Sequence, residues 1–576
     1  MAEARSSEPS SLSTLPDSQR RIDAAILAAL GLTLALSVRG LSPKPHADFY
    51  GIWETGDALI HGELPASFKR APVYPVLVAL GGELLRLCGV REVPAQRAAE
   101  WINTLLLPVN MVLTCLLGWR WIGAAARWAA WWFGLLPIGL YCTTNLLVEP
   151  LLITTILLTL IAAARASSWA YAAAALATMT RYDAAGLLAG LLLADVLARR
   201  PLRRTLLLMA AAAVPLAVWL ILTAATWNTR SAGHYLIEMV ERPTFNPLPA
   251  VSVTHAVCLD IDRFRFPYVL QDVEPFLRYA VHAGLIAAAL FGLVIGLRTA
   301  RGTIPLVTLS AGYILVHAIF PFHFDRFGYP LAPGYLLLAS AGLEGARARL
   351  GVPSGLRRTT DGLMLVLVVV SSLAIVGELR SFRFLTASKY VWAQPLPALA
   401  LLATALLWGS ANAAGHRTLR RVAALLALCA IGLAHIRNAV PRVAGGDEME
   451  NVVAAARWVR DYVPAGQRVL SPVSGLLRLY AGRHPADRFP AFEDISAGTW
   501  PDILAECRSR NIHYIIWYEG LFGELGDYYV RRCRLERFTA LSQPESVGGV
   551  DVAAYYPEHP PLWILRVLRQ DEAQAP

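Results

Sequence analysis

Long apolar runs recur along this chain from Ile22 to His435 and then stop. One helical crossing of a bilayer needs about 20 predominantly apolar residues, so a series of such runs restricts the chain to a helical membrane fold. The composition agrees, since 56% of the residues are hydrophobic and 16% are charged, whereas a soluble domain carries about 25% charged residues. We therefore expect a polytopic α-helical membrane protein with a polar domain at its C-terminus.

The net charge of +10 comes almost entirely from arginine, because lysine occurs only at positions 44, 69 and 389. Much of the arginine lies in short connections between the apolar runs, for example in residues 199–204 and 347–358. Basic residues in short loops mark the cytoplasmic face of a membrane protein. The basicity is therefore a topology signal, and it predicts no nucleic-acid partner.

The topology can be counted from the N-terminus. Residues 1–21 form a polar leader without an evident cleavage site, so we expect an uncleaved first span and a cytoplasmic leader. About thirteen crossings then lie between residues 22 and 443, and the arginine-rich loops fall inside. The odd number of crossings places residues 444–576 outside the cytoplasm. The expected spans are 22–41, 98–119, 128–144, 149–165, 169–181, 183–198, 204–226, 277–297, 303–321, 328–345, 360–378, 393–410 and 419–437.

Two of these spans, 169–181 and 183–198, are shorter than a full crossing requires. They meet at Arg181-Tyr182-Asp183, so we expect both helices to end beside a polar cavity. Segment 72–90 is apolar but is interrupted by prolines and a glutamate. We interpret it as a juxtamembrane or re-entrant helix, because counting it as a span would reverse the later topology against the charge pattern.

Two expected outside connections, residues 43–71 and residues 227–276, are too long to be plain turns. Loops of this size are usually lids, binding elements or disordered segments. In the second loop, Asp260 and Asp262 are candidate ligands for a divalent cation, although an Asp-x-Asp pair in a loop is more commonly a solvated turn. The sequence leaves the need for a metal open.

Beyond Gly445 the apolar runs give way to the helix–strand alternation typical of a soluble α/β domain. We expect a small, partly parallel sheet covered by helices. Cys507 and Cys533 lie in this domain, where a disulfide is possible only outside the cytosol. The expected helices are 447–462, 499–511 and 521–533, and the expected strands are 468–471, 512–518, 550–556 and 562–568.

The first outside loop combines carboxylates with a basic pair. Asp48 follows the first span by a few residues, and Glu54 and Asp57 come next. Carboxylates and cations at a membrane face suit a substrate whose phosphate lies at the headgroup level. Asp48 is the leading candidate for a general base, and a solvated loop aspartate is the alternative. Lys69 and Arg70 are either phosphate ligands or snorkelling anchors.

Glu149 is a second candidate carboxylate. Apolar residues flank it and Pro150 follows it, so we expect it to begin a span at the outer face. It is either a favourable charge at a helix N-terminus or a group that faces a cavity. Arg181 and Asp183 likewise form either an internal ion pair or part of a phosphate-binding site, in which the guanidinium contacts the oxyanion.

A further polar cluster lies at the expected outer edge of the tenth span, in the segment Phe322-His-Phe-Asp-Arg-Phe-Gly-Tyr-Pro330. Arg326 is another candidate phosphate ligand there, beside Asp325 and His323. Tyr329 is a candidate supporting residue. The alternative is an ordinary aromatic belt at the membrane interface.

Taken in order, these motifs resemble the GT-C superfamily of integral-membrane glycosyltransferases, and in particular the bacterial relatives of protein O-mannosyltransferases and lipid A aminoarabinose transferases. In that family an acidic motif opens the first outside loop, and a helix of the Lys-Pro-Pro-Leu-Tyr type follows it. The similar segments here are Asp48-Phe-Tyr50, Lys69-Arg-Ala-Pro-Val-Tyr-Pro75, Glu149-Pro150, Thr180-Arg-Tyr-Asp183, Arg326-Phe-Gly-Tyr-Pro330, Ala455–Pro464 and Tyr480–Arg483.

The resemblance implies a polyprenyl-phosphate sugar donor, an inverting transfer to an acceptor hydroxyl on a lipid, glycan or protein, and a catalytic base near Asp48. It also implies a bacterial inner membrane with the acceptor on the outer side. One departure is Phe49, which stands where many members carry a second adjacent acid. The second carboxylate must then come from one of three residues: Glu54, Asp57 or Glu149. Neither the sugar nor the acceptor follows from the resemblance.

Two other functions are compatible with the sequence, namely a transporter or flippase of lipid-linked glycans and a polysaccharide polymerase or ligase. A transporter places its essential charges near the midplane, often in matching internal halves, whereas a transferase needs them at one face. The sequence contains no second copy of the Asp48 loop or of the Arg181 step. On the expected topology the charges lie at the outer face, which favours the transferase.

The topology yields a test with two reporter fusions. A reporter joined after Gly446 should be active outside the cytoplasm, and one joined after Arg200 should be active inside, because the arginine-rich loops are held in the cytoplasm. Alkaline phosphatase and a fluorescent protein report the two compartments. The opposite pair of results would reverse the orientation.

Overall fold

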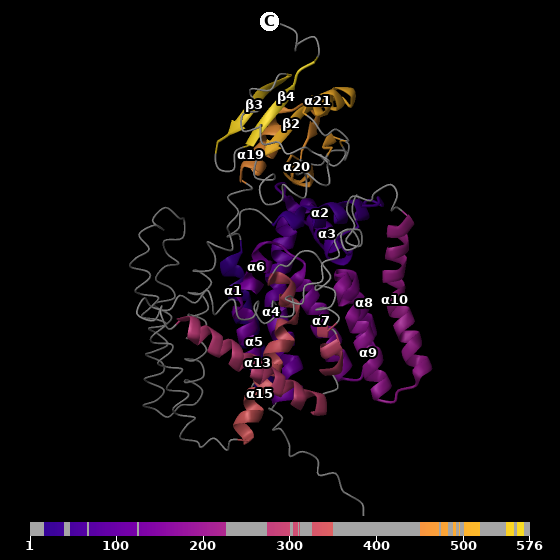
Figure 1. Ribbon diagram of the computed structural model, residues 1–576, viewed down its shortest axis with the longest axis vertical. Helices are drawn as coiled ribbons and strands as arrows, with labels where there is room; N and C mark the ends of the chain where they lie inside the picture. Colours follow the sequence, from indigo (N-terminus) through magenta and orange to yellow (C-terminus); the bar gives the residue numbers. More distant parts are fainter. Residues whose placement is uncertain are drawn as a thin grey trace, which may run out of the picture. The chain divides into compact units, whose positions relative to one another are not determined.

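The computed structural model is mainly helical, with a small sheet near the C-terminus (Figure 1). Its contacts divide the chain into two units. Unit 1 comprises Met1–Leu41, Ala71–Tyr74 and Ala99–Ala444, and unit 2 comprises Ser42–Arg70, Pro75–Ala98 and Gly445–Pro576. The residues described are 17–39, 46–65, 68–123, 126–225, 274–299, 303–308, 310–311, 325–349, 450–471, 474–481, 488–490, 495, 500–518, 549–557 and 562–569.

Unit 1 is a group of packed helices. Its largest apolar core lies around α7, which is hydrophobic on all sides and is buried along most of its length, as expected of a central helix. Helix α8 packs against it, and α8, α9 and α10 lie side by side (Figure 1). The elements are α1 (Asp17–Val38), most of α4 (Pro94–Ile122), α5 (Ala126–Leu135), α6 (Pro137–Thr144), α7 (Glu149–Ala164), α8 (Trp169–Thr180), η2 (Tyr182–Ala185), α9 (Gly186–Leu197), α10 (Leu202–Ala225), α13 (Glu274–Thr299), η5 (Asp325–Leu331) and α15 (Ala332–Arg349).

The expected spans can be compared with these helices where the structure describes them. Within the described residues, Pro94–Trp119 and Leu202–Ala225 are long and apolar enough to cross a membrane, and the bent pair Ile138–Thr144 and Glu149–Ala164 adds a third if it forms one span. The three spans expected between 360 and 437 lie outside the described residues. The count of about thirteen crossings therefore stays a prediction.

The span expected over residues 128–144 is interrupted at Leu136, because two helices occupy this segment. Helix α5 ends at Leu135 and α6 begins at Pro137, with Leu136 extended at φ −63° and ψ 118°. Proline disfavours the helical conformation in the residue before it and fits the first turn of the helix that follows. A 3-10 helix, η5, contains Pro330 and occupies the start of the span expected over 328–345.

Segment 72–90 forms the helix α3 (Val73–Leu87), as expected. Residues 43–71, the expected first outside loop, are about half helical, since they contain α2 (Ala47–Ile60). Most of both helices belongs to unit 2, together with the C-terminal residues. There, Glu54 of α2 forms an ion pair with Arg478, and the Tyr480 hydroxyl donates a hydrogen bond to Gln96 over 2.9 Å.

The C-terminal part of unit 2 contains the small mixed sheet that the sequence predicted. The strand order is β1-β2-β4-β3, with β1 parallel to β2 and the other two pairs antiparallel. Helix α19 places Val452, Ala456 and Val459 on one buried face, the spacing of an amphipathic helix. The elements are α19 (Glu450–Tyr462), β1 (Arg468–Leu470), α20 (Ser474–Tyr480), α21 (Trp500–Ser509), β2 (Ile512–Tyr518), β3 (Val550–Tyr556) and β4 (Leu562–Val567).

Cys507 lies on α21 in the apolar core of this domain, and its thiol is free. Burial raises the pKa of the Cys507 thiol to about 12. The thiolate, which is the form that reacts, is therefore scarce at neutral pH. Cys533 lies outside the described residues, so pairing of the two cysteines is untested.

Helices α13 and α15 pack closely through glycine. A Cβ added at Gly292 would lie 1.8 Å from the Leu338 carbonyl oxygen, and one added at Gly342 would lie 1.8 Å from the Ala288 carbonyl oxygen. Two backbones can approach this closely only where neither carries a side chain, which is how small residues serve helix interfaces in membranes.

We expect Gly292→Ala to lower the free energy of unfolding by about 1–3 kcal/mol, because the methyl group forces the two helices apart. Gly284→Ala is the matched control on the same helix, since a Cβ there meets nothing within 4 Å. It should be neutral or slightly stabilising, because alanine favours a helix over glycine. Thermal unfolding of both purified variants in detergent measures the difference, and equal melting temperatures would contradict the close packing.

Candidate functional site

The chain bends sharply just before Glu149. Helices α6 and α7 meet at an angle of 118°, and Leu146 in the connection has a φ of +57°. A non-glycine residue seldom adopts this left-handed conformation without support from its surroundings. The neighbouring hydrogen bonds supply that support.

Two buried side chains hold the connection on its N-terminal side. The Tyr74 hydroxyl lies 3.2 Å from the Leu146 carbonyl oxygen and 3.1 Å from Asn103 Oδ1. The Asn103 amide donates to the Leu147 carbonyl over 3.0 Å and to the Cys142 carbonyl over 3.4 Å. Both side chains are fully buried. Asn103 therefore satisfies carbonyl groups that the helix break would otherwise leave without partners.

Asn110, two turns further along α4, holds the C-terminal side of the same connection. Its amide nitrogen donates to the Pro150 carbonyl over 2.8 Å, and its oxygen accepts from the Thr154 hydroxyl over 2.7 Å. Asn110 has no exposed surface. Glu149 thus lies between two backbone segments that α4 holds by hydrogen bonds.

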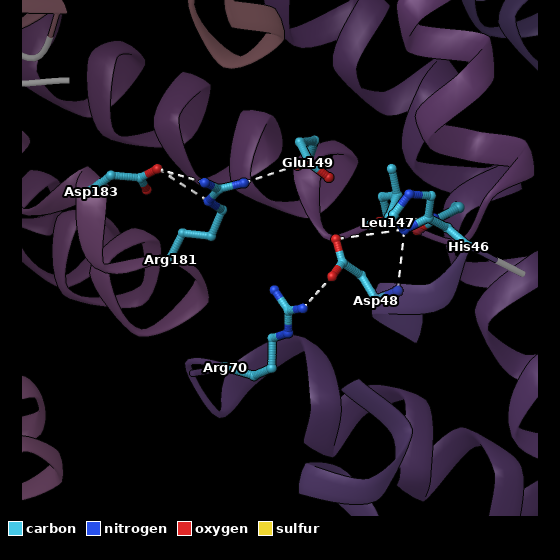
Figure 2. A network of polar contacts seen from close by, with 8 residues as sticks. His46, Asp48, Arg70, Leu147, Glu149, Arg181 and Asp183 are labelled. Carbon is cyan, nitrogen blue, oxygen red and sulfur yellow. Dashed lines mark hydrogen bonds and ion pairs between the residues drawn. The ribbon is translucent and has the colours of Figure 1, made fainter. Parts of the chain in front are cut away.

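Glu149 begins α7, as expected, and its side chain is buried with 2% exposure. The positive end of the helix dipole favours an anion at this position. One oxygen, Oε1, accepts a hydrogen bond from Arg181 Nη1 over 2.9 Å (Figure 2). The other oxygen, Oε2, is buried and has no hydrogen-bond partner among the described residues. A buried carboxylate oxygen in this state has the capacity to accept a proton or a donor from a bound molecule.

Arg181 joins Glu149 to a second carboxylate. Its Nη2 lies 2.9 Å from Asp183 Oδ2, and its Nε donates to the same oxygen over 3.1 Å (Figure 2). The Asp183 side chain is 6% exposed and that of Arg181 is 19% exposed. The ion pair between Arg181 and Asp183, one of the two alternatives that the sequence left open, is therefore present, and the guanidinium also contacts Glu149. We call these three residues the Arg181 cluster.

Tyr182, between the two charged residues, lies at the start of η2, where the break between α8 and α9 falls. Its hydroxyl accepts a hydrogen bond from Trp219 Nε1 over 2.7 Å, which connects the break to α10. The two short helices therefore meet at charged groups, at the Arg181-Tyr182-Asp183 step that the sequence predicted, and the polar cavity expected beside them stays a prediction. Buried charges of this kind need partners in an apolar environment, and the Arg181 cluster provides them.

In unit 2, Asp48 lies in the first turn of α2, where a carboxylate is favoured. It forms an ion pair with Arg70, and His46 Nδ1 lies 3.5 Å from its other oxygen (Figure 2). The imidazole of His46 also accepts the Asp48 backbone N–H over 3.1 Å and so caps the helix. With 23% exposure, the Asp48 side chain is accessible to a bound molecule.

The other expected site residues have distinct surroundings. Glu54 is engaged by Arg478, and Lys69 is half-buried beside Arg70. Arg326 and Tyr329 both lie in η5 and are buried. The Tyr329 ring stacks on Phe133 with centroids 5.4 Å apart. Tyr329 is therefore part of the apolar core, and that contact gives it a packing role.

Among the described residues, no group of three or more His, Cys, Asp or Glu side chains could hold a metal ion. Asp260 and Asp262, the candidate cation ligands, lie outside the described residues, so a metal requirement is untested. The described clusters pair each carboxylate with arginine, and this donor set suits anion chemistry better than cation binding.

Of three comparisons with known proteins, the one with solved structures finds a similar fold. No protein-family model matches the chain, and no curated protein sequence matches it. The crystal structure of ArnT from Cupriavidus metallidurans bound to undecaprenyl phosphate is similar over 96% of this chain and 99% of that one, with a TM-score of 0.57 and 13% identity. The apo form of ArnT from the same organism is similar over 96% and 98%, with a TM-score of 0.55 and 14% identity.

The chain is less similar to the structure of the archaeal oligosaccharyltransferase AglB from Archaeoglobus fulgidus in complex with an inhibitory peptide and a dolichol-phosphate. The similarity covers 97% of this chain and 75% of that one, with a TM-score of 0.49 and 12% identity, values too low to support a conclusion. The likeness to ArnT shows the fold. The mainly helical fold with a small sheet near the C-terminus, expected from the sequence, is thus the fold that this chain shares with ArnT over 96% of its length.

The Arg181 cluster predicts that Arg181→Ala is strongly destabilising. The substitution leaves two buried carboxylates without their shared counter-ion, and breaking such a pair costs about 3–5 kcal/mol. Arg86→Ala is the matched control, since Arg86 pairs with Glu83 at an exposed position where a pair contributes little. Thermal unfolding in detergent checks both, and a wild-type melting temperature for Arg181→Ala would show that the cluster is not a structural ion network.

Proposed function

We propose that this protein is a GT-C-type glycosyltransferase that moves a hexosyl or pentosyl group from a polyprenyl-phosphate donor to an acceptor hydroxyl on the outer side of the membrane. The observation that carries the proposal is the fold shared with ArnT over 96% of the chain, because that ArnT structure is bound to undecaprenyl phosphate. The acceptor class (lipid, glycan or protein) stays open.

Asp48 is the proposed general base. The transfer needs a group that takes the proton from the acceptor hydroxyl as the new glycosidic bond forms and the bond between the sugar and the phosphate breaks. The Asp48 carboxylate, which forms an ion pair with Arg70, can accept that proton. The partial exposure of the side chain, 23%, leaves room for an acceptor.

The proposed donor-phosphate ligands are Lys69, Arg70, Arg181 and Arg326. Their roles differ because their present partners differ. Arg70 forms an ion pair with Asp48, and Arg181 forms ion pairs with both Glu149 and Asp183. A phosphate that approached Arg181 would have to share the guanidinium with Glu149 and Asp183. We therefore assign Arg70 and Lys69 the main contact with the phosphate, and Arg181 the added role of orienting Glu149.

Glu149 is the proposed second carboxylate. Its open oxygen and its burial suit a group that contacts a bound molecule rather than solvent. Two uses fit this geometry: Glu149 accepts the proton in place of Asp48, or it accepts a hydrogen bond from the substrate and fixes its position.

The experiment incubates the purified protein with candidate polyprenyl-phosphate sugars and measures the release of polyprenyl phosphate. Asp48→Asn keeps the size of the side chain and removes the proton-accepting charge. Base catalysis usually contributes 10²–10⁴-fold, so transfer should fall by at least about a hundredfold while donor binding is retained.

The Glu149→Gln variant distinguishes the role of Glu149 from that of Asp48. If Glu149 only fixes the substrate, the loss of transfer should be smaller than for Asp48→Asn. Near-normal transfer by Asp48→Asn, together with lost transfer by Glu149→Gln, would assign the base to Glu149. Normal transfer by both folded variants would remove both carboxylates from the mechanism. No release from any donor by the wild-type protein would count against the transferase itself.

A further inference from the structure

A cavity of about 300 Å³ lies in unit 1 where α7 ends, α8 begins and α9 ends. Its wall is largely apolar and includes Ala163, Ala170 and Leu191. Four polar side chains interrupt this apolar wall, namely Ser167, Tyr171, Asp195 and Arg200. The cavity therefore offers an apolar surface and a small charged group together, which is the pattern of a site for an amphiphilic molecule.

The charged group in the wall is already organised. Arg200 Nη1 lies 2.9 Å from Asp195 Oδ1. The other Asp195 oxygen accepts hydrogen bonds from the Tyr171 hydroxyl over 3.1 Å and from the Thr205 hydroxyl over 3.4 Å. The negative charge of Asp195 is thus balanced by Arg200, and both of its carboxylate oxygens have polar partners. Arg200 has further N–H donors beyond the one that faces Asp195, so an anion in the cavity would meet donors rather than an unpaired carboxylate.

The segments around the cavity are basic. Arg203 and Arg204 lie in the first turn of α10, beside Thr205, and Arg165 and Arg199 end the two helices that line the cavity. These four arginines form no ion pair with a carboxylate within the described residues. A basic pocket between membrane helices is the usual site for the phosphate headgroup of a lipid.

Exposed apolar side chains lie on the same segments. Trp169 is 76% exposed, Leu197 is 60% exposed and Leu207 is 62% exposed. Tryptophan is enriched where protein meets the membrane interface. The apolar surface next to the basic residues favours a lipid over a free phosphate ion.

This cavity is separate from the Arg181 cluster. Helix α7 runs from Glu149 to Ala164 and α8 from Trp169 to Thr180. The cluster lies at the N-terminal end of α7 and the C-terminal end of α8. The cavity lies at the C-terminal end of α7 and the N-terminal end of α8. The separation along α7 is about 20 Å, from a rise of about 1.5 Å per residue. The cavity therefore belongs to the other face of the helical layer.

From these observations we propose that the cavity binds an anionic phospholipid, with the phosphate on Arg200 and the neighbouring arginines and part of an acyl chain against the apolar wall. On the expected topology this is the cytoplasmic face, where anionic lipids attract basic segments. The proposal does not depend on the transferase activity, since it uses none of the residues assigned to it.

Native mass spectrometry of the full chain in detergent tests the proposal, with phosphatidylglycerol as the probe and phosphatidylcholine of the same acyl chains as the neutral comparison. The wild-type protein should retain phosphatidylglycerol and release phosphatidylcholine. The double variant Arg203→Ala, Arg204→Ala should bind phosphatidylglycerol about thirtyfold more weakly, the change expected from removing two charges near a membrane surface.

Two further variants distinguish this site from non-specific charge. Ala194→Leu fills the cavity without changing the charge and should also weaken binding. The matched double variant Arg457→Ala, Arg460→Ala removes two exposed arginines elsewhere and should bind as the wild type does. Gel filtration confirms that each variant is folded.

Three results would overturn the proposal. Equal retention of the two lipids would show that the headgroup is not recognised. Displacement of phosphatidylglycerol by millimolar inorganic phosphate would make this a site for free phosphate. Wild-type affinity in both the Arg203→Ala, Arg204→Ala protein and the Ala194→Leu protein would show that the lipid binds elsewhere.

Discussion

A single guanidinium between two buried carboxylates ties the centre of unit 1 together. Arg181 ends α8, Glu149 begins α7, and Asp183 lies in the short η2 turn before α9. None of these charges could be buried alone, because an unpaired charge in an apolar environment is very costly. The positions of three helix ends are therefore linked by the need of each charge for its partner. Arg181 contacts one Glu149 oxygen, and the other, Oε2, has no hydrogen-bond partner among the described residues.

Polar residues of α4 also fix the position of the bend at which Glu149 lies. Asn103 and Asn110 lie two turns apart on one face of α4, and each holds carbonyl groups beside the bend before Glu149. A helix that breaks inside an apolar layer leaves backbone groups without partners, and in a membrane only protein groups can replace water. The break at residues 145–148 is possible because α4 supplies those partners, and the candidate carboxylate is held at the break.

Local patterns in the sequence predicted much of this structure. Strand β2 over 512–518, the start of α7 at Glu149 and the break at Arg181 follow from propensity, proline position and an interrupted apolar run. The break at Pro137 was missed, although the rule for the residue before a proline could have found it. Asn103 and Asn110 also left a signal, namely amides inside an apolar run.

Contacts between distant segments could not be predicted in this way. Nothing near Glu54 in the sequence indicates Arg478, and nothing near Gln96 indicates Tyr480. Likewise, the ion pair between Asp48 and Arg70 depends on the backbone between α2 and α3. Spacing shows which charges share a loop, but three-dimensional packing decides which of them meet.

Unit 2 combines segments that are far apart in the chain, and they are therefore synthesised at different times. Glu54 and its partner Arg478 are separated by 424 residues, and the chain builds most of unit 1 between them. At a synthesis rate of about 5–20 residues per second, α2 emerges roughly 20–85 seconds before α20 exists. During that interval its carboxylate faces water or another protein in place of Arg478. Assembly of unit 2 is thus a late event that joins the earliest and the last parts of the chain.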